Sequence, residues 1–229
     1  MSVNVLAISA SPLKDERLFC ELYALASERR RKKVDALRFE KDKRLSLAAE
    51  FLLMHACEKS GYDYKTLKFS ENAFSKPFFL NCPLKFSLSH SEEMALCAAG
   101  DTEVGCDTEF VRPVEHSIAE RFFAREEAEY LAKIRDENAR TDAFFRLWTL
   151  KESVIKCAGK GLSMPLDSFC VDISDVFPHI KPESLSYKAA EFEICEGYKC
   201  AVCAENKKAK FEFTVLDTDI YESRLNLWK

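Results

Sequence analysis

The sequence of 229 residues has no long apolar run and no leader-like start. No stretch approaches the roughly 18 consecutive apolar residues that a membrane-spanning helix needs. The N-terminal letters MSVNVLAISASP lack the charged start and the extended apolar segment of a signal peptide. Stretches rich in Pro, Gly and Ser, which would mark a flexible linker, are also missing. We therefore expect a cytoplasmic protein that does not enter a membrane and whose parts pack closely.

Neither sign of charge dominates the chain. It has 34 Lys and Arg against 38 Asp and Glu, which gives a net charge of −4. This balance does not indicate a nucleic-acid-binding protein. The segment 28–44 departs from it, with nine basic residues against four acidic ones. Such a cluster is either a solvated helical face or a local site for anions.

Cysteines are numerous, but their arrangement does not indicate disulfides. The ten cysteines are scattered, and several lie in apolar runs such as 94–99 and 200–204. In a small secreted protein this number would suggest disulfide bonds. Here we expect reduced cysteines that behave as small apolar side chains. Cys200-x-x-Cys203 has no second pair at zinc-finger spacing, so it is a weak indication of a metal site.

The pattern of apolar residues predicts strands and helices in the same order twice. Helices are expected over 16–55, 118–134 and about 141–157. Strands are expected over 3–9, 86–89, 94–99, 104–110, 168–173, 187–195, 198–204 and 210–216. Glu196-Gly197 is a plausible hairpin turn. This order predicts an α+β fold with two similar halves, 1–103 and 104–229. The inference comes from element order alone, since the halves show no convincing sequence repeat.

Two acidic residues lie in the predicted strand Val104–Phe110, whose sequence is VGCDTEF. Alternation along a strand puts Asp107 and Glu109 on the same side, about 7 Å apart. Two such carboxylates repel each other unless a cation lies between them. Magnesium, a hard cation that binds oxygen, is the usual one. The alternative is an exposed strand face from which both acids point into water.

The predicted helix that follows carries FRLWTLKESVIK over Phe145–Lys156. Trp148, Glu152 and Lys156 are spaced four residues apart and share one face of this helix. A third carboxylate and an ammonium group one turn apart are suited to a metal and phosphate site. The alternative is an ordinary surface Glu–Lys pair worth about 0.3–0.5 kcal/mol, with Trp148 in the core.

Further upstream, FSLSHS places His90 among three serines, just after a short strand. Serine hydroxyls, loop amides and a histidine N–H all donate to phosphate oxygens. A Ser–His nucleophile pair is a rival, but adjacent strand residues such as Ser89 and His90 face opposite ways. No hydrolase elbow supports that rival, and a purely structural histidine is the other alternative. Lys76 precedes a proline and is therefore expected in extended backbone, where it adds a further cation.

The motifs follow one another in a definite order, which is Lys76, FSLSHS, VGCDTE, Phe122-Phe123 and LWTLKESVIKCAGKGL. In this order the chain resembles a 4′-phosphopantetheinyl transferase of the long, monomeric type that activates peptide synthetase and fatty-acid carrier proteins. The resemblance extends from about residue 27 to residue 204. Cys106 stands where the family motif usually has Ile or Val, and we expect it to point into the core.

The resemblance implies two α+β halves related by a pseudo-twofold axis, with coenzyme A and Mg²⁺ in the cleft between them. The implied reaction transfers 4′-phosphopantetheine from coenzyme A to a serine of an apo acyl or peptidyl carrier protein. Its other product is 3′,5′-ADP. The first half is expected to contact the phosphates of coenzyme A, and the second to supply the metal-binding acids and the catalytic helix. A monomer is expected because both halves belong to one chain.

The resemblance also assigns roles to particular residues. Asp107, Glu109 and Glu152 would hold the metal, and Lys156 would contact the transferred phosphate. Phosphates of coenzyme A would be bound by Ser89, His90, Lys76, Arg29 and Lys32.

Three of these implied roles depend on looser matches. The match of Arg29 and Lys32 can slide by one residue. Glu152 is the first choice for the base that removes the serine proton, directly or through water, and Glu127 is the second. The carrier protein is expected to dock on Ser117–Arg140.

Two other functions compete with this interpretation. A non-catalytic coenzyme A-binding scaffold would hold a carrier protein without modifying it, but the complete set of acids and Lys156 argues against it. A metal-dependent phosphodiesterase would also use three acids. Such an enzyme often needs a second metal, and the sequence offers no further acid or histidine cluster for one.

Overall fold

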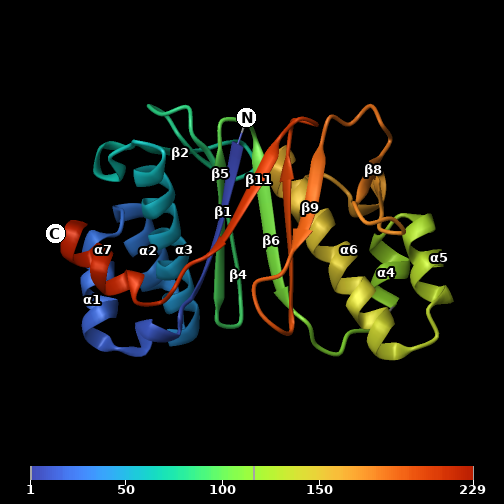
Figure 1. The fold of residues 1–229 in the computed structure, drawn as a ribbon, viewed down its shortest axis with the longest axis horizontal. Coiled ribbons are helices and arrows are strands. Elements are labelled where there is room, and N and C mark those ends of the chain that lie inside the picture. Colours follow the sequence, from blue (N-terminus) through green and yellow to red (C-terminus); the bar gives the residue numbers. More distant parts are fainter. Residues whose placement is uncertain (1, 116, 229) are drawn as a thin grey trace.

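Two β-sheets lie next to each other in the centre of the molecule, and helices cover the outer side of each sheet (Figure 1). The computed structural model describes residues 2–115 and 117–228. The first sheet has the strand order β11-β1-β5-β4, and the second has the order β6-β10-β9. The strands are β1 (Ser2–Ser9), β4 (Lys85–Ser91), β5 (Met94–Gly100), β6 (Val104–Phe110), β9 (Lys188–Phe192), β10 (Tyr198–Ala204) and β11 (Lys210–Val215).

Helices form the two outer layers. They are α1 (Glu16–Leu25), α2 (Glu28–Ala36), α3 (Glu40–Lys59), α4 (Ser117–Phe122), α5 (Arg125–Lys133), α6 (Glu137–Ala158) and α7 (Ile220–Trp228). The side chains of Asp15, Ser27 and Asp136 each accept a hydrogen bond from a backbone N–H three residues on, and so cap α1, α2 and α6. Gly159 ends α6 with a φ of +65°, which favours glycine.

The two halves share one topology. In the first half the chain runs β1, α3, β4, β5, and in space the strands are ordered β1-β5-β4. In the second half it runs β6, α6, β9, β10, and the strands are ordered β6-β10-β9. Every pairing within these two sets is antiparallel. The α+β fold class with two similar halves is therefore confirmed.

Alternation along the strands separates a middle core from two outer ones. Side chains such as Val5, Leu96 and Cys106 pack between the two sheets. Two further cores lie between each sheet and its own helices. Cys106 is fully buried in the middle core, as its position between Gly105 and Asp107 predicts.

The C-terminal segment returns to the first half. Strand β11 pairs in parallel with β1, from Ser2 opposite Lys210 to Ala7 opposite Val215. In α7 the buried Tyr221 packs on Phe51 of α3, with ring centroids 4.4 Å apart. A division of the chain at residue 103 stays a prediction, and residues 210–228 contact the first half.

Several element boundaries differ from those predicted. Helix α6 begins at Glu137 under an Asp136 cap, and not at Thr141 or Asp142. The segment 118–134 is two helices, because the chain is extended at Ala124 between α4 and α5. The short strands β2 (Phe69–Glu71), β3 (Pro77–Phe79), β7 (Cys170–Asp172) and β8 (His179–Lys181) form two small two-stranded sheets.

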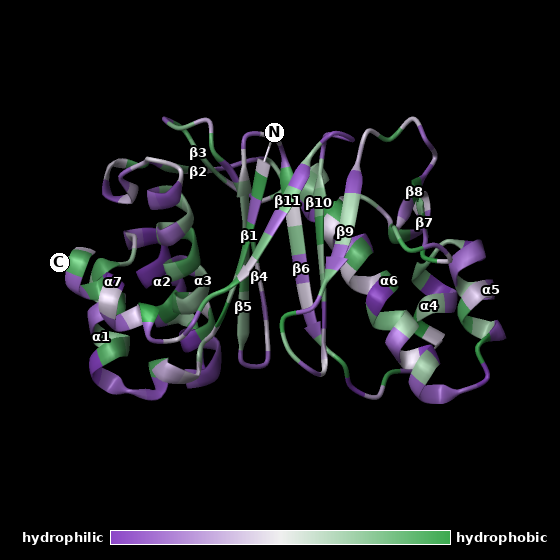
Figure 2. Cartoon of the chain, in the orientation of Figure 1, coloured by the Kyte–Doolittle hydropathy of each residue, from purple (hydrophilic) through white to green (hydrophobic). Residues whose placement is uncertain are grey.

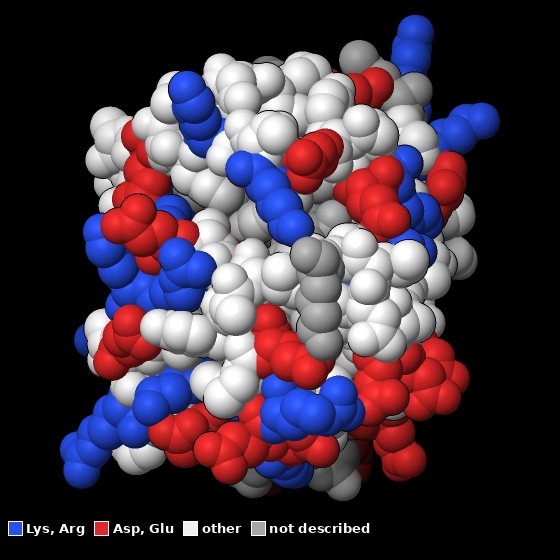
Figure 3. All heavy atoms as spheres, turned by 90° about the vertical axis from the view of Figure 1, so that its left-hand side faces the viewer, with Lys and Arg blue, Asp and Glu red and all other residues white. Residues whose placement is uncertain are grey.

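The outer surface of the first half carries mixed charges. Figure 2 shows α2 as hydrophilic over nearly its whole length. In Figure 3, which faces the side of α1 and α7, basic and acidic side chains are interspersed. Within the described part of the chain, no helix combines the length and apolar character needed to cross a bilayer.

Candidate active site

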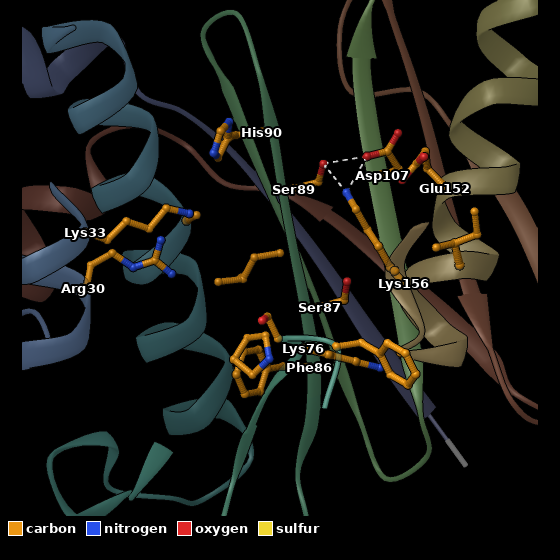
Figure 4. Close-up of a pocket in the computed structure, with 18 of the residues that line it drawn as sticks. Arg30, Lys33, Lys76, Phe86, Ser87, Ser89, His90, Asp107, Glu152 and Lys156 are labelled. Atoms are coloured by element: carbon orange, nitrogen blue, oxygen red, sulfur yellow. Dashed lines mark hydrogen bonds and ion pairs between the residues drawn. The ribbon is translucent and has the colours of Figure 1, made fainter. Parts of the chain in front are cut away.

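A cleft of about 630 Å³ lies where the two halves meet. Its first wall comes from α2, the loop before β3 and strand β4, and its second wall from β6 and α6 (Figure 4). The polar residues that line it include Arg29, Arg30, Lys33, Lys76, Ser87, Ser89, His90, Asp107, Glu109, Glu152 and Lys156. The structure thus gathers most of the predicted site residues into one cavity.

The acidic wall depends on the close packing of α6 against β6. Gly105, Asp107 and Glu109 alternate with side chains buried on the opposite face of β6. A Cβ atom at Gly105 would lie 2.0 Å from the carbonyl oxygen of Ser153 and 2.3 Å from the backbone nitrogen of Cys157. Only glycine allows this approach, and the approach brings Glu152 and Lys156 of α6 beside the acids of β6.

The three acids share one wall but are not fully neutralised. Asp107 is only 4% exposed, and its Oδ2 atom has no hydrogen-bond partner. Burial, followed by the charge of Asp107, raises the pKa of Glu109. The same two causes, in the same order, raise the pKa of Glu152. A positive charge beside these carboxylates would therefore stabilise the wall.

Lys156 supplies one such charge. Its Nζ lies 2.6 Å from Asp107 Oδ1 and donates to Ser89 Oγ at 3.0 Å (Figure 4). Burial opposes the charge of this ammonium group, but the carboxylates of Asp107 and Glu152 outweigh burial and raise its pKa. Lys156 is therefore protonated at neutral pH and points at the acids.

Serines on alternate positions of β4 join the two halves beside the acids. Ser89 Oγ donates to Asp107 Oδ1 at 2.8 Å, and Ser91 Oγ donates to Glu109 Oε2 at 3.0 Å. Ser87 accepts from the backbone N–H of Cys106, and Ser91 accepts from that of Phe110. These hydroxyls satisfy amide groups on the edge strand β6 that no neighbouring strand pairs. We predicted phosphate contacts for Ser89, but not these hydrogen bonds between β4 and β6. The serines at every second position of FSLSHS are the sequence signal for them.

The opposite wall is cationic. Arg29 and Arg30 of α2, with Lys33 one turn further along the helix, line the cleft. Desolvation, followed by the charges of Arg30 and Arg29, lowers the pKa of Lys33. Desolvation by the walls, followed by the charges of Lys33 and Lys156, lowers the pKa of His90. An anion bound here would relieve the repulsion among these groups.

Lys32 does not line this cleft, so its contact with phosphate stays a prediction to which the structure gives no support. Its side chain is 75% exposed, and its ammonium pairs with Glu28 at 2.7 Å. Successive residues of a helix point about 100° apart, so a slide of one residue replaces Lys32 by Lys33. Arg29 does line the cleft, where it also pairs with Glu71 at 2.8 Å.

Lys76 lines the cleft, but its ammonium is bound within the protein. Nζ lies 2.8 Å from Glu103 Oε2 and donates to the carbonyls of Val104 and Cys157 at 3.1 Å. The side-chain amide of Asn72 donates to the carbonyl of Gly159 at 2.8 Å. This loop of the first half is thereby fastened to the end of α6. A contact of Lys76 with phosphate stays a prediction.

Glu127, the second choice for the base, lies outside the cleft. Its carboxylate is 1% exposed and binds Lys151 Nζ at 2.6 Å through both oxygens. It also accepts from the backbone N–H groups of Ala124 and Val171. Both carboxylate oxygens of Glu127 are therefore engaged in the protein interior, and its role as a base stays a prediction. The sequence around Glu127 did not indicate that this residue of α5 forms a buried ion pair with Lys151 of α6.

The acids suit a hard divalent cation by their chemistry. Carboxylate oxygens are the ligands that Mg²⁺ prefers, and the orphaned Oδ2 of buried Asp107 lacks any other partner. As they stand, no three His, Cys, Asp or Glu side chains within residues 2–115 and 117–228 are grouped closely enough for a metal. Lys156 is bound to Asp107 instead. A cation would therefore have to replace that ammonium.

Comparisons with known proteins agree on one family. The model of the 4′-phosphopantetheinyl transferase superfamily matches residues 103–203, which include β6, α6 and all but the last residue of β10. The 4′-phosphopantetheinyl transferase Sfp of Bacillus subtilis (strain 168) is 36% identical over 159 residues, which cover 67% of this chain and 70% of that protein. The 4′-phosphopantetheinyl transferase psf-1 of Bacillus pumilus is 30% identical over 233 residues, which cover 98% and 99%.

Proposed function

Because the chain belongs to the 4′-phosphopantetheinyl transferase superfamily, we propose that it transfers 4′-phosphopantetheine from coenzyme A to a serine of an apo carrier protein. Relatives with this name cover nearly the whole chain. The acceptor is an acyl or peptidyl carrier protein, and 3′,5′-ADP is the second product. The chain is thus an enzyme, and a passive scaffold has no support.

One observation carries this proposal, namely the opposite charges on the two walls of a single cleft. Arg29, Lys33 and His90 form a wall that suits the phosphates of coenzyme A. The facing wall carries three acids, which would repel a diphosphate unless a cation bridged the two. A bound diphosphate and a divalent cation together would neutralise both walls.

We assign Asp107, Glu109 and Glu152 as the residues that would hold Mg²⁺. All three line the cleft, and burial and mutual repulsion raise the pKa of Glu109 and of Glu152. When bound, the metal would neutralise charge on the diphosphate of coenzyme A. Side chains of this protein would position the reacting groups, accept the serine proton and stabilise the remaining negative charge.

Those side chains position the reacting groups and move one proton. The serine oxygen of the carrier forms a bond to the β-phosphorus, and the bond from that phosphorus to the oxygen of 3′,5′-ADP breaks. Glu152, which lines the cleft, accepts the serine proton, directly or through water. Lys156 donates hydrogen bonds to the phosphoryl oxygens, where negative charge has to be stabilised.

The acceptor protein has to reach the cleft from outside. We propose that it docks on Ser117–Arg140, which includes α4 and α5. Phe122 is 48% exposed there and lies beside the exposed Arg121. An apolar side chain next to a guanidinium group suits a partner with an acidic rim around an apolar patch. Both walls of the cleft come from one chain, so we propose that a monomer is active.

The decisive test is transfer to an apo carrier protein. The enzyme is incubated with apo carrier, coenzyme A and MgCl₂, and the carrier is weighed by mass spectrometry. We expect the carrier to gain one phosphopantetheine arm. Unchanged carrier mass, under conditions where a relative of established activity modifies the same carrier, would refute the proposal. Loss of coenzyme A without a carrier present would indicate a phosphodiesterase instead.

The role of Glu152 as base has its own test. Glu152→Gln should lose transfer by roughly two orders of magnitude or more. The matched control is Glu222→Gln, because Glu222 is an exposed acid of α7, far from the docking segment in sequence, that pairs with Arg17. Full turnover by the Glu152→Gln enzyme, with Mg²⁺ bound as in wild type, would remove Glu152 from this role.

A further inference from the structure

The ammonium of Lys156 lies where the acidic wall needs a positive charge. Nζ is 2.6 Å from Asp107 Oδ1 and 3.0 Å from Ser89 Oγ. We propose that Lys156 is an internal placeholder for the divalent cation. It neutralises Asp107 in the ligand-free enzyme and is displaced when the cation binds. This inference rests on the proposed function, in which the acids hold that cation.

The acidic wall requires a placeholder because it is partly buried. Asp107 is 4% exposed, and Glu109 and Glu152 lie on the same wall. An isolated carboxylate that is shielded from water is strongly destabilising. The wall therefore needs a positive charge before any ligand arrives, and Lys156 is the cation that contacts Asp107.

The contact is built so that it can be released. The Lys156 side chain is 31% exposed and reaches one oxygen of Asp107, while Oδ2 has no partner. Five residues earlier on α6, Lys151 is 0% exposed and contacts both oxygens of Glu127 and the carbonyl of Phe169. Lys151 is sealed on every side, whereas Lys156 has a flexible stem and an open cleft beside it.

Displacement links cation binding to the delivery of a catalytic group. While Lys156 pairs with Asp107, its ammonium competes with the cation for one carboxylate oxygen. Once the cation occupies Asp107, the ammonium is free to contact a phosphoryl oxygen. By reciprocity, a change that removes Lys156 from Asp107 must strengthen cation binding.

The test measures cation affinity without coenzyme A or a carrier protein. Free Mn²⁺ is followed by its paramagnetic resonance signal during titration of the wild type, Lys156→Met and Lys33→Met. Lys33→Met removes the same charge from the opposite wall of the cleft without a contact to Asp107. We expect the Mn²⁺ dissociation constant to fall about tenfold or more in Lys156→Met. Lys33→Met should lower it less than about threefold, because solvent screens the longer distance.

A second pair of variants keeps the test informative if Lys156→Met folds poorly. Ser89→Ala removes a hydrogen bond from both Lys156 and Asp107 but leaves all charges in place. Ser87→Ala removes a hydroxyl of the same strand that contacts Cys106 instead. We expect tighter Mn²⁺ binding in Ser89→Ala and unchanged binding in Ser87→Ala.

The outcomes separate this inference from the proposed function. Equal Mn²⁺ affinity in the wild type and Lys156→Met would overturn the placeholder while leaving the metal assignment intact. Equal gains in Lys156→Met and Lys33→Met would also overturn it, since the effect would be one of net charge. If neither the wild type nor Lys156→Met binds Mn²⁺ while transfer to the carrier proceeds, the acids have no metal role and the placeholder falls with it.

Discussion

The buried ion pair between Glu127 and Lys151 should be a major stabilising element of the second half and have no part in the chemistry. Glu127→Gln keeps the size of the side chain but removes its charge. One oxygen becomes an NH₂ group that faces a backbone donor, because the N–H groups of Ala124 and Val171 both point at the carboxylate. Lys151, which is 0% exposed, then lacks a counter-charge.

The expected loss follows from burial. Breaking a buried pair by removing one partner costs about 3–5 kcal/mol. For a protein of this size each kcal/mol moves the melting temperature by about 2–4 °C, so a fall of roughly 6–20 °C is expected. Calorimetry or circular dichroism would measure it. The double variant Glu127→Gln/Lys151→Met should lose less than the sum of the two single variants, because it leaves no lone charge.

Measuring both the melting temperature and the transfer rate of Glu127→Gln distinguishes a structural role of Glu127 from a catalytic one. The control is Glu126→Gln, an exposed neighbour in the first turn of α5, which should melt like the wild type. At a temperature where the Glu127→Gln protein is folded, transfer to the carrier should proceed at close to the wild-type rate. An unchanged melting temperature with transfer abolished would refute this reasoning and restore Glu127 as a candidate base.

Two further predictions follow from the walls of the cleft. Gly105→Ala should destabilise the fold by about 1–3 kcal/mol, measured by chemical denaturation, because its Cβ overpacks against α6. The same variant should reduce transfer, measured by the mass of the carrier. Because the pKa of His90 is lowered, the folded state binds its proton less tightly than the unfolded chain does. Its contribution to stability is complete above about pH 6.5 and is lost as pH falls through the lowered pKa. An NMR titration should show this pKa rise when 3′,5′-ADP binds, and an unmoved pKa would exclude His90 from the phosphate site.

The sequence predicts the repeated α+β order because strands and helices have different apolar periods. β6 and β10 have the predicted bounds, and the turn at Gly197 is formed with a φ of +81°. The start of α6 was wrong because its first turn is polar and exposed, so apolar periodicity did not reach Asp136. The return of α7 to the first half was not predicted, since no local pattern encodes which distant surface a short helix covers.

The candidate site was predicted where residues lie on one regular element. Strand alternation placed Asp107 and Glu109 on one side, and the helical repeat placed Glu152 and Lys156 on one face. Partners across the cleft were not accessible in this way. The contact of Ser89 with Asp107 and the displacement of Lys32 from the wall both depend on how the halves pack, which local spacing does not specify.

The shared topology of the halves makes their chemical difference the basis of the site. Strand β1 has no acidic residue, whereas the equivalent strand β6 carries Asp107 and Glu109. The buried Glu50 of α3 pairs with Arg30 at 2.8 Å and accepts a hydrogen bond from the hydroxyl of Ser27. Glu152 of the equivalent helix α6 instead faces the cleft with its pKa raised. The first half therefore presents excess positive charge and the second excess negative charge across one seam. The proposed ligand, a diphosphate with a divalent cation, would satisfy both at once. In this proposal the shared topology accounts for the cleft, and the chemical difference between the halves accounts for its choice of ligand.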